Sequence, residues 1–401
     1  MKGTKVMAEI MFREFEIADV PATFRLGIET FPMAKWVLAD WEAWVSKDFT
    51  GVVAYEGTRL LGMLNLKKLT YRVAPGAQLA VWVQHGVATD ESVRGKGVGS
   101  GIQRKARELL KGRGDMTLVY RGAEKSPAYH FYMKSGLYDV GTARSYQLAG
   151  NPGATLPPPC RILSEETFFA RAADVFTAYR KAREDLAGQP EKDVNTMKRQ
   201  VGATCSMRGA DYRFVYLVRT AGDAITDYCV LAGAGDYLKI MDFTATTSLV
   251  AQELLSGALA LTPALALDAS PGTLLEAAAL SLGATTNSRD LSVTFMMAGI
   301  LDVESAGAKV WRSVPALDNV EVRVWTAERD GVIHWVKSPE RTITLEMKEP
   351  TLSAMLCRRL SVKTAIEEER ITVVGHREGD IDALNEALRP CAWHYDFIDH
   401  L

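Results

Sequence analysis

The sequence of 401 residues contains few of the features that mark secreted or membrane-spanning proteins. Its five cysteines are odd in number and widely spaced, and no Cys-x-x-Cys pair occurs. This pattern favours reduced thiols and a cytoplasmic protein over a disulfide framework. The longest uncharged apolar run, residues 254–267, is interrupted by Pro263 and is too short to cross a bilayer. The N-terminal segment has no apolar stretch of the kind found in secretion signals.

Charge and metal-ligand patterns are also sparse. The net charge is −2, which gives no electrostatic reason to expect a nucleic acid or an anionic membrane as partner. The six histidines do not share the spacing of metal ligands, so the sequence predicts no metal site. We expect structural or surface roles for all of them except His85, whose role stays open.

The length and composition of the chain predict a multidomain mixed α/β protein. A chain of 401 residues is too long for one ordinary core. Residues 150–159 contain a Gly-Asn-Pro-Gly run and three consecutive prolines, which are typical of a linker. We expect three domains, comprising residues 1–150, 151–298 and 299–401.

The stretch that carries the most information comprises residues 79–101. It begins as a strand in which Val81, Val83 and His85 share one face. A short polar connection and the glycine-rich run RGKGVG, residues 94–99, then lead into an amphipathic helix pattern. A strand that feeds glycines into a helix N-terminus favours anion binding, because free backbone N–H groups and the helix dipole converge there.

The spacing of the glycines narrows the choice of anion. No reading frame supplies a nucleotide-binding P-loop, and Ser100 stands where a dinucleotide-binding motif needs glycine. The run does fit Arg-x-x-Gly-x-Gly, with Arg94, Gly97 and Gly99. Together with residues 87–89 it resembles the pyrophosphate-binding motif of the GNAT N-acetyltransferases. The alternative is an ordinary strand-to-helix turn with a glycine cap.

The neighbouring segments strengthen this resemblance. Residues 128–137, AYHFYMKSGL, resemble the GNAT helix whose tyrosine, here Tyr132, faces the coenzyme sulfur. Lys125 departs from the family, which often has asparagine there, and this puts one contact to the pantetheine arm in doubt. The resemblance implies acetyl-CoA as co-substrate. The residues implied in its binding are Val87, Ala88, Thr89, Arg94, Gly95, Lys96, Gly97, Val98, Gly99, Ser100, Ser126 and Pro127.

The rest of the chain extends the resemblance. Residues 164–179 carry a long helix pattern, and the segments that follow, up to residue 282, repeat the β-β-β-α-β-α order. Residues 245–248 read Ala-Thr-Thr-Ser and lack the glycines, so we expect a degenerate GNAT copy without cofactor. The last hundred residues resemble a sterol-carrier-protein-like α+β module. This combination resembles the enhanced-intracellular-survival (Eis) family, which implies a homo-oligomer, specifically a hexamer.

The expected reaction is direct attack of a primary amine on the acetyl group, since no Cys or Ser nucleophile is placed beside a base. Tyr132 would donate to the departing thiolate, and a backbone N–H near Val87 or Thr89 to the carbonyl oxygen. Eis-like chains use their C-terminal carboxylate as base, which implies Leu401 as a second catalytic residue. A side chain such as Asp396, Asp399 or His400 is the alternative, and a frayed terminus without a role is a third possibility.

Aromatic and acidic residues between the first helix and the second strand suit a cationic acceptor. We expect Glu29 and Trp36 in the acceptor site, although packing of an amphipathic helix on the sheet would also explain such a pattern. The resemblance implies a small-molecule amine, an aminoglycoside-like polyamine. Two alternatives remain open, namely a protein-lysine acetyltransferase and a non-catalytic protein that binds an apolar ligand.

Overall fold

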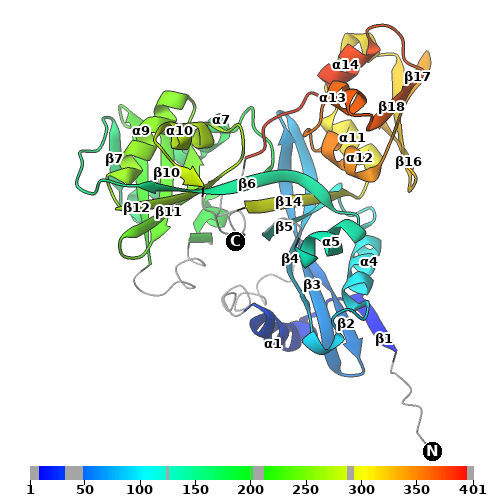
Figure 1. Ribbon diagram of the computed structural model, residues 1–401, viewed down its shortest axis with the longest axis horizontal. Coiled ribbons are helices and arrows are strands. Elements are labelled where there is room, and N and C mark those ends of the chain that lie inside the picture. The colour runs from blue at the N-terminus through cyan, green and yellow to red at the C-terminus, as the bar shows by residue number, and fades with distance from the viewer. Residues whose placement is uncertain are drawn as a thin grey trace, which may run out of the picture.

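The chain folds into three parts (Figure 1). The computed structural model describes residues 9–31, 48–122, 126–198, 200–201, 212–286 and 293–394. The first part contains β1 (Ile10–Glu14), η1 (Ile17–Asp19), α1 (Val20–Thr30), β2 (Phe49–Glu56), β3 (Arg59–Ala74), β4 (Ala77–Thr89), η3 (Glu91–Val93), α4 (Val98–Leu110), β5 (Met116–Gly122), α5 (Pro127–Lys134) and β6 (Tyr138–Ala149).

The second part contains β7 (Cys160–Leu163), α6 (Glu165–Ala170), α7 (Ala172–Ala182), β8 (Gln189–Pro190), β9 (Arg213–Ala221), β10 (Ala224–Gly233), β11 (Tyr237–Thr244), α9 (Ser248–Leu259), β12 (Ala264–Ala269), α10 (Leu274–Ser281) and β13 (Thr285–Thr286), and β14 (Val293–Ile300) follows. The third part contains α11 (Val303–Val310), η4 (Pro315–Leu317), β15 (Val320–Trp325), β16 (Asp330–His334), β17 (Arg341–Met347), α12 (Glu349–Leu356), α13 (Val362–Glu367), β18 (Ile371–Val374) and α14 (Asp380–Ala387).

The local structure expected around the glycine-rich stretch is confirmed, because β4 is followed by α4, β5 and α5 in that order. The repeated β-β-β-α-β-α order in the second part is confirmed by β9, β10, β11, α9, β12 and α10. One expectation was wrong in detail. The helix pattern that begins at residue 164 forms two helices, α6 and α7, because Arg171 leaves the helical backbone conformation with φ −101° and ψ 30°.

In the described part of the chain, one sheet of 14 strands joins the first two parts, in the order β1-β2-β3-β4-β5-β14-β6-β12-β11-β10-β9-β7, with β8 and β13 off this path. Strand β6 makes the sheet continuous, since its beginning pairs with β14 and its end with β12 (Figure 1). The two parts therefore share backbone hydrogen bonds as well as side-chain contacts.

Strand β14 returns from the second part into the first and lies antiparallel between β5 and β6. The expected boundary between residues 298 and 299 falls inside this strand, so the sheet does not divide there. Met296, Met297 and Ala298 are fully buried, because both faces of the strand are covered. A strand buried on both faces lacks the alternating pattern by which strands are found in a sequence.

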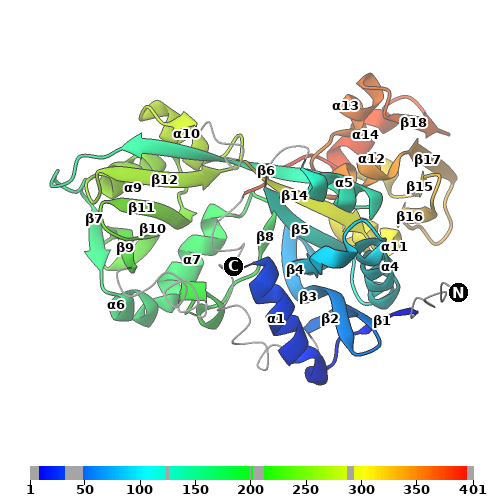
Figure 2. The same ribbon diagram turned by 60° about the horizontal axis from the view of Figure 1, so that its bottom comes forward.

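The two faces of the first part of the sheet are covered by different elements. Val81 and Val83 of β4 belong to a core shared with the third part, whereas Trp82 between them packs in a core with α4. Figure 2 shows α4 and α5 beside β4, β5 and β14. This alternation is the one expected from residues 81–85.

The third part has its own four-stranded sheet, in the order β16-β15-β17-β18. Buried Arg358 ties its helices together by donating hydrogen bonds to the carbonyl oxygens of Val310, Ala387 and Arg389, at 2.8, 3.2 and 2.6 Å. Because Val310 and Ala387 end α11 and α14, the cation satisfies carbonyl groups that helix ends leave unpaired. None of the described helices is long and apolar enough to cross a membrane.

Trp393 lies where the three parts meet. Its indole N–H donates to the carbonyl oxygen of Cys357 in the third part at 2.7 Å. Its ring lies so close to Gly188 and Gly141 that a Cβ on either would come within 2.4 and 3.2 Å of it. Trp393 is 1% exposed, so the chain is firmly anchored just before residues 395–401.

Candidate active site

The site begins where two parallel strands separate. β4 pairs with β5 only from Val81 to Gln84, yet β4 continues to Thr89 along β3. The register with β3 shifts around Gly86, which has φ +54°. Beyond Gln84, no described strand pairs with the β5 side of β4, so backbone N–H groups on that edge of β4 can face a ligand.

The glycine-rich run lies at the amino end of α4, next to this opening. Gly95 and Gly97 have φ of +77° and +85°, a region that side-chain-bearing residues rarely adopt. Gly97 is the N-cap of α4 and supplies no side-chain hydrogen bond. A Cβ at either glycine would project into open space. The uncapped helix start, with this space before it, fits a pyrophosphate group.

The connection before these glycines is held by the side chain of Asp90. Its carboxylate accepts hydrogen bonds from the Ser92 backbone N–H at 2.9 Å and from Arg59 at 2.8 Å. Hydrogen bonds from the Ser92 hydroxyl and from Arg59 lower the pKa of Asp90 to about 2. The carboxylate therefore stays charged at neutral pH. Arg94 and Lys96 are exposed, so the run itself carries two cations at the surface.

The absence of a side chain at Gly99 lets α5 pack closely against α4. A Cβ on Gly99 would lie 3.0 Å from the ring of Phe131, closer than ordinary van der Waals contact allows. Glycine at this position thus lets the helix that carries Tyr132 approach the first turn of α4. Ser126 caps α5 by accepting a hydrogen bond from the Tyr129 N–H at 3.3 Å.

Tyr132 projects from α5 into an apolar cluster with Val119, Leu137 and Met297. It is 8% exposed, and burial raises its pKa to about 12. Its hydroxyl therefore stays protonated at neutral pH and can donate. Among the described residues, none forms a hydrogen bond with that hydroxyl.

A buried polar pair fixes the point at which β4 and β5 separate. Gln84 of β4 and Gln103 of α4 exchange hydrogen bonds at 3.2 and 2.7 Å, and Gln84 also donates to Thr117 of β5 at 3.2 Å. The sequence interpretation missed this pair, and the polar residues at buried positions of the strand and helix patterns were the available signal. It also missed β14 and the side chain of Met297 beside Tyr132.

The structure brings most of the predicted residues into one region. The predicted coenzyme residues lie at the end of β4, in the connection to α4 and its first turn, and at the N-cap and start of α5: Val87, Ala88, Thr89, Arg94, Gly95, Lys96, Gly97, Val98, Gly99, Ser100, Ser126 and Pro127. Glu29 is exposed near the end of α1. Trp36, Lys125 and Leu401 lie outside the described residues. No group of metal-ligating side chains occurs in the described part of the chain.

In the second part, two parallel strands separate in the same way, but the start of the following helix, α9, is capped by a side chain. β11 pairs in parallel with β12 only from Tyr237 to Lys239, and a cavity of about 350 Å³ lies beyond, lined by Phe243, Thr246 and Thr273 among others. The hydroxyl of Thr247 caps α9 by accepting from the Val250 N–H at 3.2 Å. A helix start occupied by its own side chain has fewer N–H groups for a phosphate.

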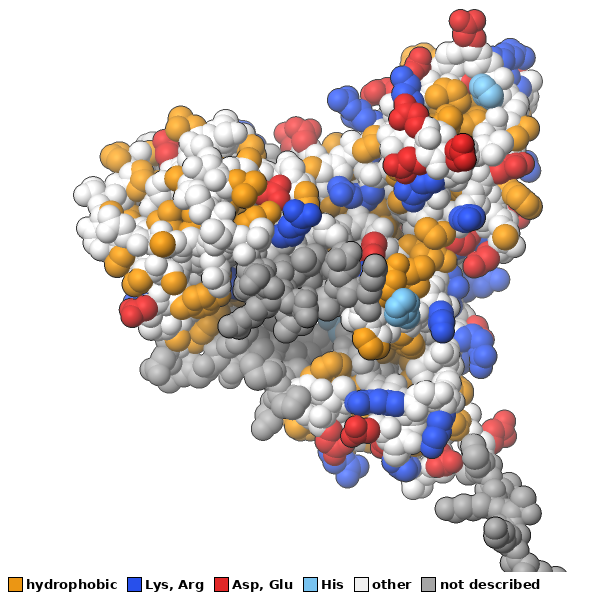
Figure 3. Space-filling model, in the orientation of Figure 1, with side chains coloured by type: hydrophobic (Ala, Val, Ile, Leu, Met, Phe, Trp, Pro, Cys, Tyr) orange, Lys and Arg blue, Asp and Glu red, His pale blue; other side chains and the backbone are white. Residues whose placement is uncertain are grey.

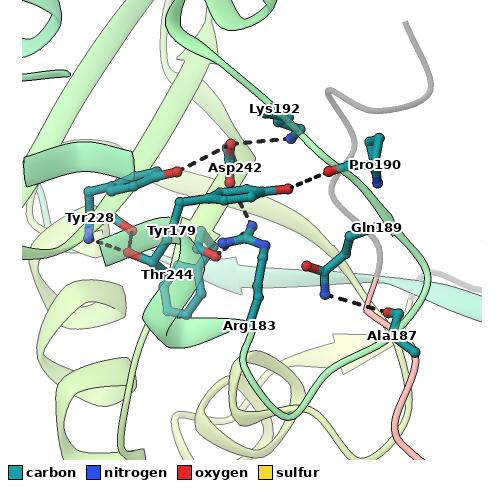
Figure 4. Close-up of polar contacts among 10 residues, drawn as sticks. Tyr179, Arg183, Ala187, Gln189, Pro190, Lys192, Tyr228, Asp242 and Thr244 are labelled. Atoms are coloured by element: carbon teal, nitrogen blue, oxygen red, sulfur yellow. Dashed lines mark hydrogen bonds and ion pairs between the residues drawn. The ribbon is translucent and has the colours of Figure 1, made fainter. Parts of the chain in front are cut away.

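Buried charges beside this cavity hold the second part together (Figure 4). Fully buried Asp242 of β11 accepts from Arg183 at 2.8 Å, and Lys192 and the Tyr228 hydroxyl lie 3.4 and 3.5 Å from its other oxygen. The Arg183 guanidinium also lies 3.9 Å from the centroid of the Tyr179 ring. These contacts tie α7 and the segment after it to the sheet.

The surface differs between the parts. On the face in view, Figure 3 shows Lys and Arg side chains on the α4 side of the first part and few charged side chains on the second part. Leu249 and Leu280, on α9 and α10, are 64% and 52% exposed. Isolated apolar side chains are common on protein surfaces, but a region poor in charge is typical of a contact surface.

Comparison with known proteins agrees with this geometry. Residues 11–137 match the family model for the acetyltransferase (GNAT) family. No curated protein sequence matches the chain.

Solved structures share its architecture over nearly its whole length. A GCN5-related N-acetyltransferase from Kribbella flavida superposes with a TM-score of 0.69 at 14% identity, covering 97% of this chain and 98% of the other. One from Anabaena variabilis gives 0.70 at 12% identity, covering 96% and 99%. Eis1 from Mycobacterium abscessus gives 0.61 at 10% identity, covering 97% and 99%. At such identities the likeness shows the fold alone.

The family match covers the segment in which β4 and β5 separate and in which the glycine run and Tyr132 lie. The likeness to the acetyltransferase (GNAT) family thus extends over residues 11–137 and includes the glycine run and Tyr132.

Proposed function

We propose that this protein is an N-acetyltransferase that moves the acetyl group of acetyl-CoA to a primary amine by direct attack. The observation that carries the proposal is the uncapped start of α4, with Gly95 and Gly97 at positive φ, beside the opening between β4 and β5. Tyr132 on α5 packs in the cluster that contains Val119 of β5, the residue that pairs with Gln84 at the point where β4 and β5 separate.

The first turn of α4 would hold the coenzyme. Backbone N–H groups of residues 98–100 and the positive end of the helix dipole suit a pyrophosphate. Arg94 and Lys96, which are exposed within the run, add positive charge. Residues 87–89 and the segment Ser126–Pro127 flank the arm that leads to the thioester.

When bound, acetyl-CoA supplies the acetyl group as a thioester. A backbone N–H at Val87 or Thr89 would stabilise the negative charge that develops on the carbonyl oxygen. The Tyr132 hydroxyl would donate a hydrogen bond to the departing thiolate, whose parent thiol has a pKa of about 8.5. Because the pKa of Tyr132 is raised to about 12, this residue stabilises the thiolate mainly by donation and keeps its proton.

A base must take a proton from the amine, whose pKa is about 10 if it is lysine-like. We assign this role to the carboxylate of Leu401, with Asp396, Asp399 or His400 as alternatives. The burial of Trp393 between all three parts fixes the point from which residues 395–401 continue. Glu29 and Trp36 are proposed as acceptor-site residues.

The proposed acceptor is an aminoglycoside-like polyamine, as the resemblance to Eis proteins implies. Thiol release from acetyl-CoA is measured with aminoglycosides, simple diamines and lysine-containing peptides. Turnover with aminoglycosides at kcat/KM at least tenfold above that of the peptides is expected. Turnover with peptides alone would instead support a protein-lysine acetyltransferase. Absence of amine-dependent thiol release with every acceptor would favour the non-catalytic alternative, in which the third part binds an apolar ligand.

Further features of the proposal concern the whole protein. The second part is proposed to be a degenerate GNAT copy without coenzyme, supported by the Thr247 cap on α9. The third part is proposed to be sterol-carrier-protein-like. A hexamer is supported by the exposed apolar side chains Leu249 and Leu280, and light scattering tests it. A cytoplasmic location is supported by the unbridged cysteines of the described residues.

A further inference from the structure

Arg121 is buried beneath the helix that carries Tyr132. It lies on β5, its side chain is 2% exposed, and its Nη2 lies 2.8 and 3.0 Å from the two carboxylate oxygens of Asp139. Its Nε lies 3.0 Å from the sulfur of Met297. Because Asp139 is on β6 and Met297 on β14, the guanidinium spans three neighbouring strands, β5, β14 and β6.

The same guanidinium contacts α5. Its central carbon lies 4.7 Å from the centroid of the Tyr129 ring, which is within the range of a cation–π interaction. Tyr129 precedes Tyr132 by three residues, so the two side chains lie on the same face of the helix. Both pack in the cluster that contains Val119 and Met297. Arg121 therefore supports the first turn of α5 from the sheet side.

Helix α5 depends on such contacts for its orientation. It has eight residues, which is too few for a helix that is stable without tertiary contacts. Its first turn is held by the Ser126 cap and by the contact between Tyr129 and Arg121. Its end is held by backbone hydrogen bonds that return to Tyr132 from Ser135 and Leu137. Loss of the Arg121 contact would release one side of the helix.

We propose that Arg121 is a positioning residue, which holds Tyr129 and thereby fixes the direction in which the Tyr132 hydroxyl donates. This inference rests on the proposed role of Tyr132. A displacement of about 1 Å at a reacting group can lower a rate 100-fold. Because α5 keeps its cap and its apolar contacts, we expect a smaller effect from the loss of Arg121, about tenfold in kcat.

A double-mutant cycle tests this inference. Arg121→Met keeps an unbranched side chain against Met297 but removes the cation. We expect kcat to fall about tenfold while KM for acetyl-CoA changes less than twofold. In a Tyr132→Phe background, Arg121→Met should change kcat less than twofold, because the hydroxyl that it positions is absent.

A second variant and a matched control complete the cycle. Tyr129→Leu removes the ring and leaves the ion pair with Asp139, and it should lower kcat without adding to the effect of Arg121→Met. The control is Arg341→Met, which removes an ion pair of similar length, 2.6 Å to Asp380, in the third part. It should leave kcat per folded enzyme unchanged. Circular dichroism measures the folded fraction of each variant.

Each outcome is decisive. An Arg121→Met or Tyr129→Leu effect of equal size with and without the Tyr132 hydroxyl would overturn the inference, and so would an unchanged kcat in both variants. A Tyr132→Phe enzyme with normal turnover would overturn the role of Tyr132 itself, and the inference with it. If Tyr132→Phe is slow but the effects are additive, only the inference about Arg121 fails.

Discussion

Replacement of Gly97 by valine tests the anion-binding run most sharply. Gly97 has φ +85°, and a Cβ there meets no atom within 4 Å. The new side chain would therefore clash with no other residue of the protein, but it would project into the space before the first turn of α4. A phosphate oxygen could then no longer reach the backbone N–H groups.

The size of the effect follows from the hydrogen bonds that are lost. A hydrogen bond to a charged group contributes about 1.5–3 kcal/mol. Loss of two such hydrogen bonds, at about 1.5 kcal/mol each, costs about 3 kcal/mol, which makes acetyl-CoA binding about 100-fold weaker. The positive φ also costs stability, by about 1–2 kcal/mol for a residue with a side chain.

Gly57 offers a matched control for this strain. It has φ +59°, a Cβ there also meets no atom within 4 Å, and it lies in the turn between β2 and β3. Gly57→Val should lower the melting temperature about as much as Gly97→Val does, but it should leave acetyl-CoA affinity unchanged. Calorimetric titration of both variants distinguishes strain from loss of the binding site.

An acetyl-pantetheine substrate, which lacks the pyrophosphate, provides the second arm of the assay. Its kcat/KM should be the same in wild type and Gly97→Val, because the run does not contact it. Unchanged acetyl-CoA affinity in Gly97→Val would refute the assignment of residues 94–100. Equal losses with both substrates would show that the substitution acts through the fold.

Three further outcomes are expected. Tyr132→Phe should lower kcat about 100-fold with little change in coenzyme affinity. Because burial raises the pKa of Tyr132 to about 12, ionisation of Tyr132 should not lower wild-type turnover below about pH 10. A decline in turnover below about pH 10 that Tyr132→Phe abolishes would contradict this prediction. Asp242→Asn leaves Arg183 and Lys192 buried without their carboxylate, so it should destabilise the fold by about 3–5 kcal/mol in urea unfolding, and a loss below about 1 kcal/mol would contradict the burial argument. Deletion of residues 398–401 should reduce turnover, and if the terminal carboxylate is the base, a glycine-serine extension after Leu401 should reduce it too. If only the extension is tolerated, the base is an internal side chain of the tail. Full activity of both variants across pH would show that the tail supplies no base.

The sequence predicted the local structure of the first part well, because glycines impose backbone geometry directly. Gly95 and Gly97 take positive φ values directly before α4, where the sequence predicted a glycine-rich turn into an amphipathic helix. The alternation of Val81, Trp82 and Val83 between two cores also followed from side-chain periodicity. Tyr132 could be placed on a helix beside the same opening because the helix motif is local.

Features that depend on distant segments could not be predicted in this way. Strand β14 enters the sheet from beyond the second part, and its burial on both faces leaves no periodic signal. The contact between Arg121 and Asp139 depends on that insertion, because it crosses Met297 of β14. The pairing of Gln84 with Gln103 requires the approach of α4 to β4, which residue order alone does not specify.

The most direct test of the central claim is the steady-state release of thiol from acetyl-CoA, followed with and without a primary amine. The account predicts that an aminoglycoside accelerates release at least 100-fold over the rate without acceptor, and that Tyr132→Phe and Gly97→Val both abolish most of this acceleration. Amine-dependent release that persists unchanged in both variants would contradict it, since the chemistry would then lie outside the site formed by β4, α4 and α5.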